Sequence, residues 1–251
     1  MISSTSNKKI KDVILLTRKP SLRKEKGLFV VEGIKMFMEI PEEDLTEVYA
    51  SESFYNTCPT EAKIRMRQVP HEIVTDTVYA YMSDTKTPQG IMAIVRMKKH
   101  TKLTGDAFLI LDRIQDPGNM GTIMRTAEAA GIDGILMNEE TVDIYNPKVV
   151  RSTMGAIFRV PFMYTDDLQG AMKELGAVTC AAHLKGEKDY DKEDYTGPTA
   201  FIIGNESAGI SDEITACADK LVKIPMKGKV ESLNAGIAAS VLMFELARQR
   251  R

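Results

Sequence analysis

Residues 224–247 read Ile224-Pro-Met-Lys-Gly-Lys-Val-Glu-Ser-Leu-Asn-Ala-Gly-Ile-Ala-Ala-Ser-Val-Leu-Met-Phe-Glu-Leu-Ala247. The proline and the glycine among the first five positions predict a loop with fixed turns. The small and aliphatic residues after Glu231 predict a long helix, with Ser232 as its N-cap and the final arginines at its negative end. Free N–H groups at the start of such a helix can hold an anionic ligand, although the pattern also fits an ordinary capped and buried helix.

Two stretches upstream also carry polar residues beside apolar runs. The first reads Asp112-Arg-Ile-Gln-Asp-Pro-Gly-Asn-Met-Gly-Thr-Ile-Met-Arg-Thr-Ala-Glu-Ala-Ala-Gly-Ile-Asp-Gly134, and the second reads Phe201-Ile-Ile-Gly-Asn-Glu-Ser-Ala-Gly-Ile-Ser211. In this order and spacing, the three stretches resemble the motifs of the SpoU/TrmH family of RNA 2′-O-methyltransferases, part of the knotted SPOUT superfamily. The resemblance covers residues 106–251.

The resemblance implies S-adenosylmethionine as the cofactor and a ribose 2′-hydroxyl of RNA as the acceptor. It assigns catalytic roles to the five polar motif residues, which are Asn119, Arg125, Glu206, Ser232 and Asn234. It places the cofactor against Gly204, Ile224 and Leu233, and Met226 adds a further apolar wall. Core packing is the alternative for the apolar residues of this set, and helix capping is the alternative for Ser232 and Asn234.

The chemistry of methyl transfer gives these residue types separate tasks. The acceptor oxygen must lie in line with the methyl group and must lose its proton as it attacks. Arginine is a poor base, so we expect Arg125 to orient the RNA and to stabilise charge. Glu206 is expected to orient Arg125 or Asn119.

The N-terminal part reads as a small α/β unit. Leu28-Phe-Val-Val-Glu-Gly33 resembles the substrate-binding domain of the same family, which implies an L30e-like fold. The predicted helices are two basic ones within 7–25 and others at 34–40 and 71–78, and the predicted strands are 27–31, 46–50, 64–69 and 91–97. We therefore expect a substrate-binding domain at 1–97, a polar linker at 98–106 and a methyltransferase domain at 107–251.

The C-terminal part predicts a parallel-sheet α/β domain, because apolar runs typical of buried strands alternate with helical segments. The predicted strands are 107–111, 134–137, 160–164, 177–182, 199–203 and 220–224, and the predicted helices are 120–130, 146–155, 168–175, 211–216 and 232–247. No G-x-G-x-x-G or P-loop pattern is present, which argues against a dinucleotide or nucleotide-triphosphate site. General folding rules do not propose knots. The deep trefoil knot is expected here only because the resemblance implies it.

Charge is unevenly distributed along the chain. The net charge is only −2, but residues 1–26 hold eight basic and two acidic side chains. Such a cluster favours a phosphate-backbone partner, and a merely solvated surface is the alternative. The expected RNA-binding residues are Lys8, Lys9, Lys11, Arg23, Lys24 and Lys26, to which the resemblance adds Arg151.

The remaining composition excludes several classes of protein. With 43% hydrophobic and 27% charged residues, the 251-residue chain is typical of a globular protein, and no apolar run is long enough to span a bilayer. The N-terminus lacks the apolar core of a signal peptide. The three cysteines have no metal-site spacing, so we expect no metal site and a cytoplasmic protein.

Assembly and substrate follow from two further features. The helix after Ser232 is apolar around most of its girth, which predicts a homodimer through Ala235, Gly236, Ile237, Ala238, Ala239, Val241 and Leu242. The additional N-terminal domain favours ribosomal RNA over tRNA as the substrate. Three alternatives stay open: a tRNA enzyme, a base methyltransferase, and a non-catalytic RNA-binding protein of the same fold.

Overall fold

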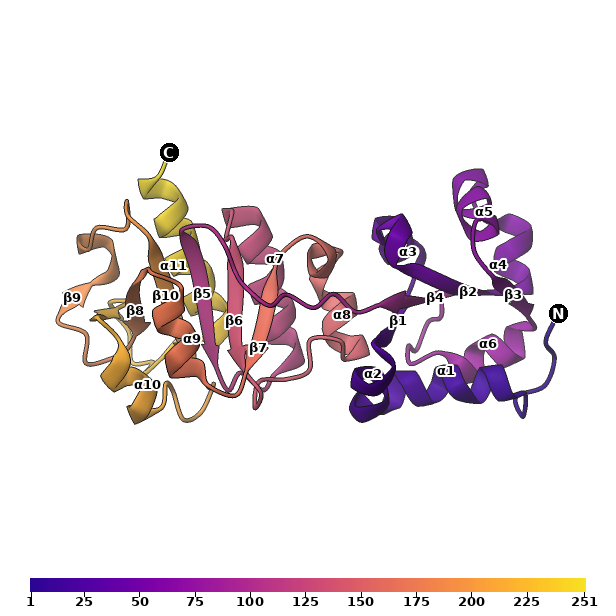
Figure 1. Ribbon diagram of the computed structural model, residues 1–251, viewed down its shortest axis with the longest axis horizontal. Helices are drawn as coiled ribbons and strands as arrows, with labels where there is room; N and C mark the ends of the chain where they lie inside the picture. Colours follow the sequence, from indigo (N-terminus) through magenta and orange to yellow (C-terminus); the bar gives the residue numbers. More distant parts are fainter. The chain divides into compact units, whose positions relative to one another are not determined.

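The computed structural model describes residues 1–251, which form two compact units (Figure 1). The first unit comprises residues 1–98 and 143–158, and the second comprises residues 99–142 and 159–251. The segment 143–158 therefore groups with the N-terminal unit, although the sequence places it in the methyltransferase domain. Aromatic packing explains this: the ring of Phe29 lies 4.6 Å from that of Tyr145 and 6.4 Å from that of Phe158.

The first unit is a four-stranded sheet with helices on both faces (Figure 1). Its strands, in spatial order, are β1 (Leu28–Glu32), β4 (Ile91–Arg96), β2 (Leu45–Ser51) and β3 (His71–Val74). β4 runs antiparallel to both neighbours, and β2 and β3 are parallel. The helices are α1 (Lys8–Arg18), α2 (Pro20–Lys26), α3 (Ile34–Glu39), α4 (Glu52–Thr57), α5 (Thr60–Arg67), α6 (Asp76–Met82) and α8 (Pro147–Thr153).

Two predicted elements of this unit are wrong. Residues 64–69, predicted as a strand, lie largely in α5, and residues 71–78, predicted as a helix, contain β3 and only the start of α6. Ile64 and Met66 alternate with arginines, which imitates the two-residue period of a strand. In the structure Ala62 and Met66, four residues apart, are buried, whereas Ile64 is 58% exposed. The three-to-four-residue period of a helix therefore governs burial here. α4 has no counterpart in the prediction, and the other predicted elements lie within three residues of their expected bounds.

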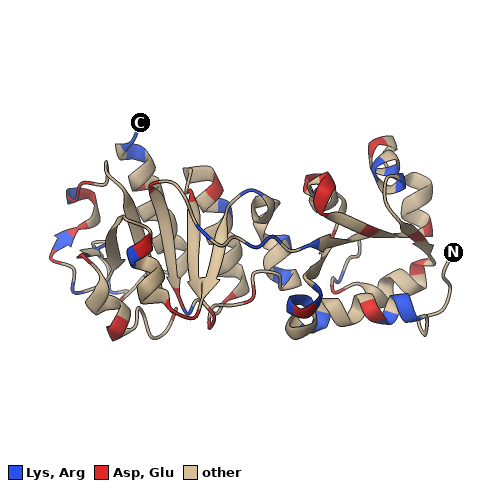
Figure 2. Ribbon diagram, viewed as in Figure 1, with Lys and Arg blue, Asp and Glu red and all other residues tan.

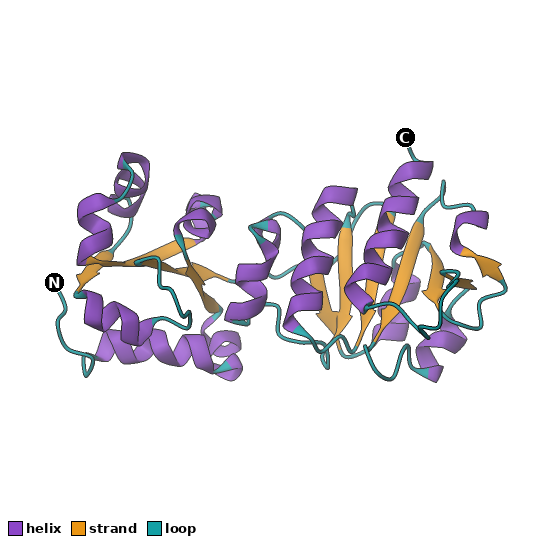
Figure 3. Ribbon diagram, turned by 180° about the vertical axis from the view of Figure 1, so that it is seen from behind, coloured by secondary structure: helices purple, strands orange, loops and turns teal.

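The second unit is a seven-stranded sheet in which every neighbouring pair is parallel. In spatial order the strands are β7 (Phe162–Thr165), β6 (Gly134–Asn138), β5 (Ala107–Asp112), β10 (Thr199–Gly204), β8 (Val178–Ala182), β11 (Lys220–Lys223) and β9 (Lys188–Asp189). One face is covered by α9 (Leu168–Glu174) and α10 (Asp212–Cys217), and the other by α7 (Pro117–Ala130) and α11 (Ala235–Gln249) (Figures 1 and 3). The predicted parallel α/β class is confirmed.

The strand order changes direction between β5 and β10. From β5 the chain adds β6 and β7 on one side, whereas β10, β8 and β11 lie on the other. Gly204, the last residue of β10, lies opposite Asp112, the last residue of β5, in the parallel ladder. Ligand sites of open parallel sheets form where the order reverses, outside the carboxyl ends of the strands. The first two sequence motifs therefore meet at the edge where such a site is expected.

α7 and α11 pack side by side on the same face of the sheet (Figure 3). A Cβ atom added at Gly236 would lie 3.3 Å from the Cβ of Thr122, so glycine permits this close approach. One turn on, the hydroxyls of Thr126 and Ser240 are 3.0 Å apart. The predicted start of α11 is corrected, because the helix begins at Ala235 and its N-cap is Asn234 instead of Ser232. None of the helices combines the length and the hydrophobicity that a membrane span requires.

Candidate functional site: three loops joined by asparagines

Three loops meet at the carboxyl edge of the second sheet through a chain of side-chain hydrogen bonds. Nδ2 of Asn119 donates to Oε1 of Glu206 at 2.8 Å. Nδ2 of Asn234 donates to Oδ1 of Asn119, also at 2.8 Å. The chain Glu206–Asn119–Asn234 thus links one residue from each of the three sequence motifs, with Asn119 in the middle.

Local capping fixes both asparagines. Asp116 is the N-cap of α7, where it accepts the backbone N–H of Asn119 at 2.8 Å, and Pro117 occupies the first helical position. Asn234 is itself the N-cap of α11, and its Oδ1 accepts the backbone N–H of Ile237 at 3.2 Å. The amide oxygen of Asn234 is thus engaged in the cap, which leaves its NH₂ group to face Asn119. The geometry of the pair follows from how the two helices start.

Glu206 accepts further hydrogen bonds that favour its ionised form. Besides Asn119, the backbone N–H groups of Gln115 and Asp116 donate to its carboxylate at 3.2 and 3.1 Å. Partial burial alone would raise the pKa of Glu206, but the hydrogen bonds from Asn119 and from backbone N–H groups outweigh it and hold the pKa below its ordinary value. Glu206 therefore binds the β5–α7 loop as an anion at neutral pH.

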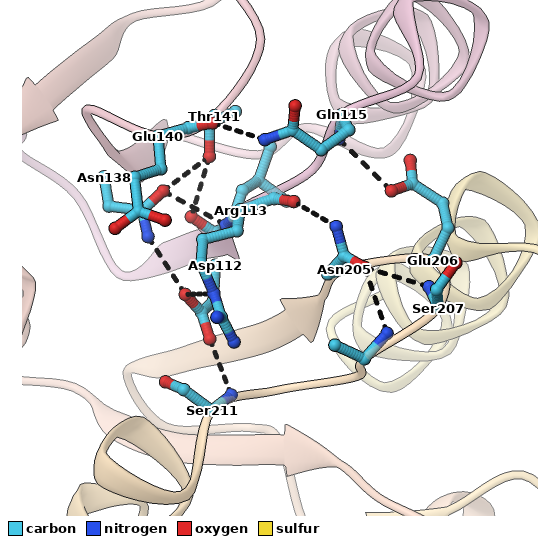
Figure 4. A network of polar contacts seen from close by, with 12 residues as sticks. Asp112, Arg113, Gln115, Asn138, Glu140, Thr141, Asn205, Glu206, Ser207 and Ser211 are labelled. Atoms are coloured by element: carbon cyan, nitrogen blue, oxygen red, sulfur yellow. Dashed lines mark hydrogen bonds and ion pairs between the residues drawn. The ribbon is translucent and has the colours of Figure 1, made fainter.

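A second network holds the same loops from the side of β6 (Figure 4). Asp112, which is buried, accepts Nδ2 of Asn138 at 2.9 Å and the backbone N–H of Ser211 at 2.7 Å. Asn205 donates to the carbonyl oxygen of Arg113 at 2.8 Å and accepts the backbone N–H groups of Ser207 and Ala208. The loops after β5, β6 and β10 are therefore tied together by side chains at the strand ends.

The network holds Arg113 in an unfavourable backbone conformation. Its φ of 60° lies in the left-handed region, which is costly for a residue with a Cβ. Its N–H donates to Oδ1 of Asn138 at 3.1 Å, and its carbonyl oxygen accepts from Asn205. Both peptide groups around the strained residue are thus held from outside. Asp112, Asn138 and Asn205 were not predicted as site residues, although all three lie one or two residues after the ends of predicted buried strands, where polar side chains gather at one edge.

A hollow of about 370 Å³ opens beside this junction, between the ends of β8, β10 and β11 and the start of α11. All four predicted cofactor residues line it: Gly204, Ile224, Met226 and Leu233. Two predicted catalytic residues, Glu206 and Ser232, also line it. Its lining residues include Glu206 and Glu231 but no lysine or arginine. The hollow therefore suits a partly apolar ligand that carries positive charge.

Gly204 has a role that the sequence did not reveal. A Cβ atom at this position would lie 2.1 Å from the backbone nitrogen of Ile210 and 2.2 Å from the carbonyl carbon of Gly209. The missing side chain thus makes room for the chain's own return past β10, where Asn205 and Gly209 form an antiparallel bridge. Gly204, Gly209 and Ile210 all line the hollow. The absence of a side chain at Gly204 therefore allows the close backbone packing that forms this wall.

Arg125 is not part of the hydrogen-bonded chain. It is exposed on α7, and its guanidinium makes no hydrogen bond or ion pair within the protein. Of the two partners expected for Glu206, the structure joins it to Asn119 and not to Arg125. Arg125 follows Thr122, which contacts α11, by three residues and so lies on nearly the same side of α7.

The predicted RNA-binding residues divide into two groups. Arg23 is only 2% exposed, and its guanidinium donates to the carbonyl oxygens of Leu16 and Thr17 and to the carboxylate of Asp143. The prediction that Arg23 binds RNA is therefore wrong, because the side chain is buried and these partners occupy its donors. The other five residues predicted from the basic cluster are exposed on α1 and α2: Lys8, Lys9, Lys11, Lys24 and Lys26. Figure 2 shows basic residues on both helices.

Like Arg23, the predicted RNA-binding residues Lys9 and Arg151 have acidic partners. Lys9 lies 2.6 Å from Glu72 and 3.5 Å from Glu47, and the hydrogen bond to Glu72 raises the pKa of Lys9. Arg151 lies 3.4 Å from Asp84, and it lines a cavity of about 10 Å³, large enough for one water molecule, together with Glu32. No cluster of three or more metal-binding side chains occurs in the chain.

Comparison with known proteins places this geometry in a family. The model of the SpoU rRNA Methylase family matches residues 106–244, and the model of the MRM3-like substrate binding domain matches residues 7–93. The chain is 29% identical to the 23S rRNA (guanosine(2553)-2′-O)-methyltransferase RlmP of Bacillus subtilis, over 98% of each chain.

Two solved structures resemble the chain over nearly its whole length. An AdoMet-bound rRNA methyltransferase from Sinorhizobium meliloti is 30% identical with a TM-score of 0.84, covering 98% of this chain and 97% of that one. The SpoU methyltransferase AviRb from Streptomyces viridochromogenes, in complex with AdoMet, is 27% identical with a TM-score of 0.87, covering 97% and 98%. Family model, relatives and structures agree with the three joined motifs, and the chain belongs to the SpoU rRNA methylase family.

Proposed function

We propose that this protein transfers a methyl group from S-adenosylmethionine to a ribose 2′-hydroxyl of structured RNA, with ribosomal RNA as the substrate. The observation that carries the proposal is the hydrogen-bonded chain Glu206–Asn119–Asn234 beside a hollow with acidic and apolar walls. The name of the Bacillus subtilis relative, a 23S rRNA 2′-O-methyltransferase, supports both the reaction and the choice of RNA.

The hollow fits the proposed cofactor. Its volume lies within the range usual for small-molecule sites. Ile224, Met226 and Leu233 offer apolar contact for an adenine ring, and Gly204 brings backbone to its edge. The acidic residues Glu206 and Glu231, with no lysine or arginine in the lining, suit a sulfonium cation. When bound, S-adenosylmethionine supplies an electrophilic methyl group.

The residues around the hollow divide the remaining work. Asn119 holds the loop after β5 against Glu206 and α11, so the wall of the site is rigid before RNA arrives. Ser232 lies in the hollow at the approach to α11, where its hydroxyl can contact the ribose. Arg125, exposed and unpaired, is available for a bidentate contact to a phosphate next to the target nucleotide. It orients the acceptor and stabilises charge.

RNA affinity is assigned to the N-terminal domain. We take residues 1–97 as an L30e-like substrate-binding domain, 98–106 as the linker and 107–251 as the methyltransferase domain. The match of residues 7–93 to the MRM3-like substrate binding domain supports this assignment. The exposed lysines of α1 and α2 supply sequence-independent contacts to phosphates, and Arg151 remains a candidate through its exposed edge.

The finer features of the family complete the proposal. We propose a deep trefoil knot in which α11 passes through the preceding loop, and a cytoplasmic homodimer. Of the predicted dimer face, Ala235, Gly236, Ala239 and Leu242 are buried within the chain. The dimer is supported by an apolar stripe on α11, formed by Ile237 (49% exposed), half-buried Val241 and Phe244 (46% exposed). Ala238, next to Ile237, lines the hollow, so a partner on this stripe would lie beside the cofactor.

Transfer of a labelled methyl group tests the function directly. The purified protein is incubated with S-adenosylmethionine labelled in the methyl group and with ribosomal RNA or tRNA from cells that lack the gene. Label in ribosomal RNA, located at a nucleotide that resists alkaline cleavage, is the expected result, because 2′-O-methylation removes the attacking hydroxyl. Label that leaves the cleavage pattern unchanged would indicate a base methyltransferase. Tight RNA binding with no transfer would indicate a non-catalytic RNA-binding protein.

A further inference from the structure

His183 is one of the residues that line the hollow, and it lies directly after the end of β8. Its backbone N–H donates to the carbonyl oxygen of Val222 in the neighbouring β11 at 2.9 Å, and its side chain lines the hollow. It is half-buried. None of the three sequence motifs contains it.

The imidazole has one nitrogen occupied and one free. Nδ1 accepts the backbone N–H of Lys185 at 3.1 Å. Because a backbone N–H can only donate, Nδ1 carries no proton in this arrangement, and the neutral ring holds its proton on Nε2. Nε2 has no partner within the protein. The hydrogen bond from the backbone of Lys185 therefore fixes the tautomer and leaves a hydrogen-bond donor on a residue that lines the hollow.

We propose that Nε2–H of His183 donates a hydrogen bond to the adenosine portion of the bound cofactor, on a ring nitrogen or a ribose oxygen. The position of His183 favours the adenosine portion. Its backbone hydrogen bond to Val222 places it beside the end of β11, and Val222 is only two residues before Ile224. Ile224 and Met226 form the apolar wall assigned to adenine. The inference rests on the proposed function, since it assigns a further binding residue to the same site.

Two substitutions of His183 distinguish the role of Nδ1 from that of Nε2. In His183→Asn, the side-chain oxygen can replace Nδ1 as acceptor for Lys185, but the donor at the place of Nε2 is lost. In His183→Gln, the longer amide can replace the donor at Nε2, but the acceptor for Lys185 is lost. A role in the cofactor site and a role in the turn therefore predict opposite rankings of the two variants.

Calorimetric titration of the full chain gives the measurement, with S-adenosylhomocysteine and 5′-methylthioadenosine as probes. We expect His183→Asn to weaken binding of both probes about three- to tenfold, the effect of one neutral hydrogen bond, and His183→Gln to stay within about twofold of wild type. His71→Asn is the matched control, because Nδ1 of His71 contacts its own loop in the first unit, and it should bind like wild type. The melting temperature of ligand-free His183→Asn should equal that of wild type.

The outcomes against the inference are distinct. Wild-type affinity in His183→Asn, with weakened binding in His183→Gln, would assign the residue to the turn alone. A reduction seen with S-adenosylhomocysteine but not with 5′-methylthioadenosine would place the acceptor in the amino-acid tail and overturn the adenosine assignment. Failure of wild type itself to bind S-adenosylhomocysteine would overturn the proposed function, and this inference with it.

Discussion

Asn119 and Asn234 are joined side chain to side chain, Nδ2 of Asn234 donating to Oδ1 of Asn119 at 2.8 Å, although 115 positions separate them in the sequence. Each residue is also fixed by a helix start, Asn119 in the first turn of α7 and Asn234 as the cap of α11. The pair therefore locks the relative position of two helices beside the hollow. Because Asn119 also donates to Glu206, its side-chain amide connects all three sequence motifs.

Asn119→Ala is expected to damage both stability and activity. It leaves the amide of Asn234 without an acceptor and removes one donor from Glu206, and unmet partners in partly buried sites cost about 1–3 kcal/mol. Unfolding of the second unit in urea should show this destabilisation, and methyl transfer should fall by at least about tenfold as the wall of the site loosens. A variant as stable and active as wild type would contradict the bridging role.

Arg125→Ala should abolish transfer without affecting the fold. The side chain is exposed and unpaired, so stability should change by no more than about 0.5 kcal/mol, and S-adenosylhomocysteine should bind as before. Methyl transfer to RNA should disappear because the acceptor is no longer oriented. Lys173→Ala, an exposed basic residue on α9 on the opposite face of the sheet, is the matched control and should stay active.

Substitution of Arg23 should lower stability, whereas substitution of its exposed neighbours in the basic cluster should weaken RNA binding. Arg23→Ala removes the partner of Asp143 and of two carbonyl oxygens and should cost about 3 kcal/mol of stability. Replacing Lys11 and Lys26 by alanine should leave stability unchanged but weaken RNA binding and flatten its salt dependence, by a slope of about 0.7–0.9 for each phosphate that is no longer neutralised. Equal salt slopes for wild type and the double variant would refute a role of these lysines in phosphate binding.

Much of this structure could be predicted, because its cues are local. The apolar runs at 107–111 and 199–203 predicted the parallel strands, and the motif residues at their ends indicated where the site would lie. Ile224, Met226 and Leu233, which were predicted to contact the cofactor, all line the same hollow. Strand ends in a parallel sheet meet at one edge whatever the details of the loops, so this part follows from the pattern alone.

Other features depended on partners far along the chain and could not be predicted. Arg23 looks like any other member of a basic cluster until Asp143, 120 residues later, is placed beside it. Ser232 and Asn234 are both good N-caps by type, and only the contact with Asn119 and the start of α11 decide for Asn234. The alternation around Ile64 imitated a strand because arginine and apolar residues happen to share a period of two.

The ionisation of Glu206 should make stability depend on pH in the acid range. Its pKa is lowered in the folded protein, so its contribution is fully present above the ordinary value of 4.5 and is lost as the pH falls through the lower folded value. The difference in melting temperature between wild type and Glu206→Gln should be constant above about pH 5.5 and should shrink as the solution is acidified below pH 4.5. A difference that grows with acidification would mean that the folded pKa is raised instead.

The apolar stripe on α11 leads to a prediction about assembly. Ile237, Val241 and Phe244 follow one another at four and three residues and so share one face of the helix, whereas Gly236 and Ser240 are already used against α7. Phe244→Glu should place a charge in the proposed dimer interface and convert the protein to a monomer. Light scattering at micromolar concentration measures the mass directly, and Ile64→Glu, at an exposed apolar site of the first unit, is the control that should remain dimeric.

Mixed dimers then decide whether the proposed interface completes the site. Arg125→Ala and Asn234→Ala subunits are each expected to be inactive as homodimers. If the unpaired Arg125 acts in the site of the partner, a mixed dimer carries one site in which both defects meet and one in which neither is present, so about half of the wild-type activity should return. If it acts in its own subunit, every site of the mixed dimer carries one defect and no activity returns. A fully active monomer in the Phe244→Glu variant would rule out the shared site, because Arg125 would then act within its own subunit.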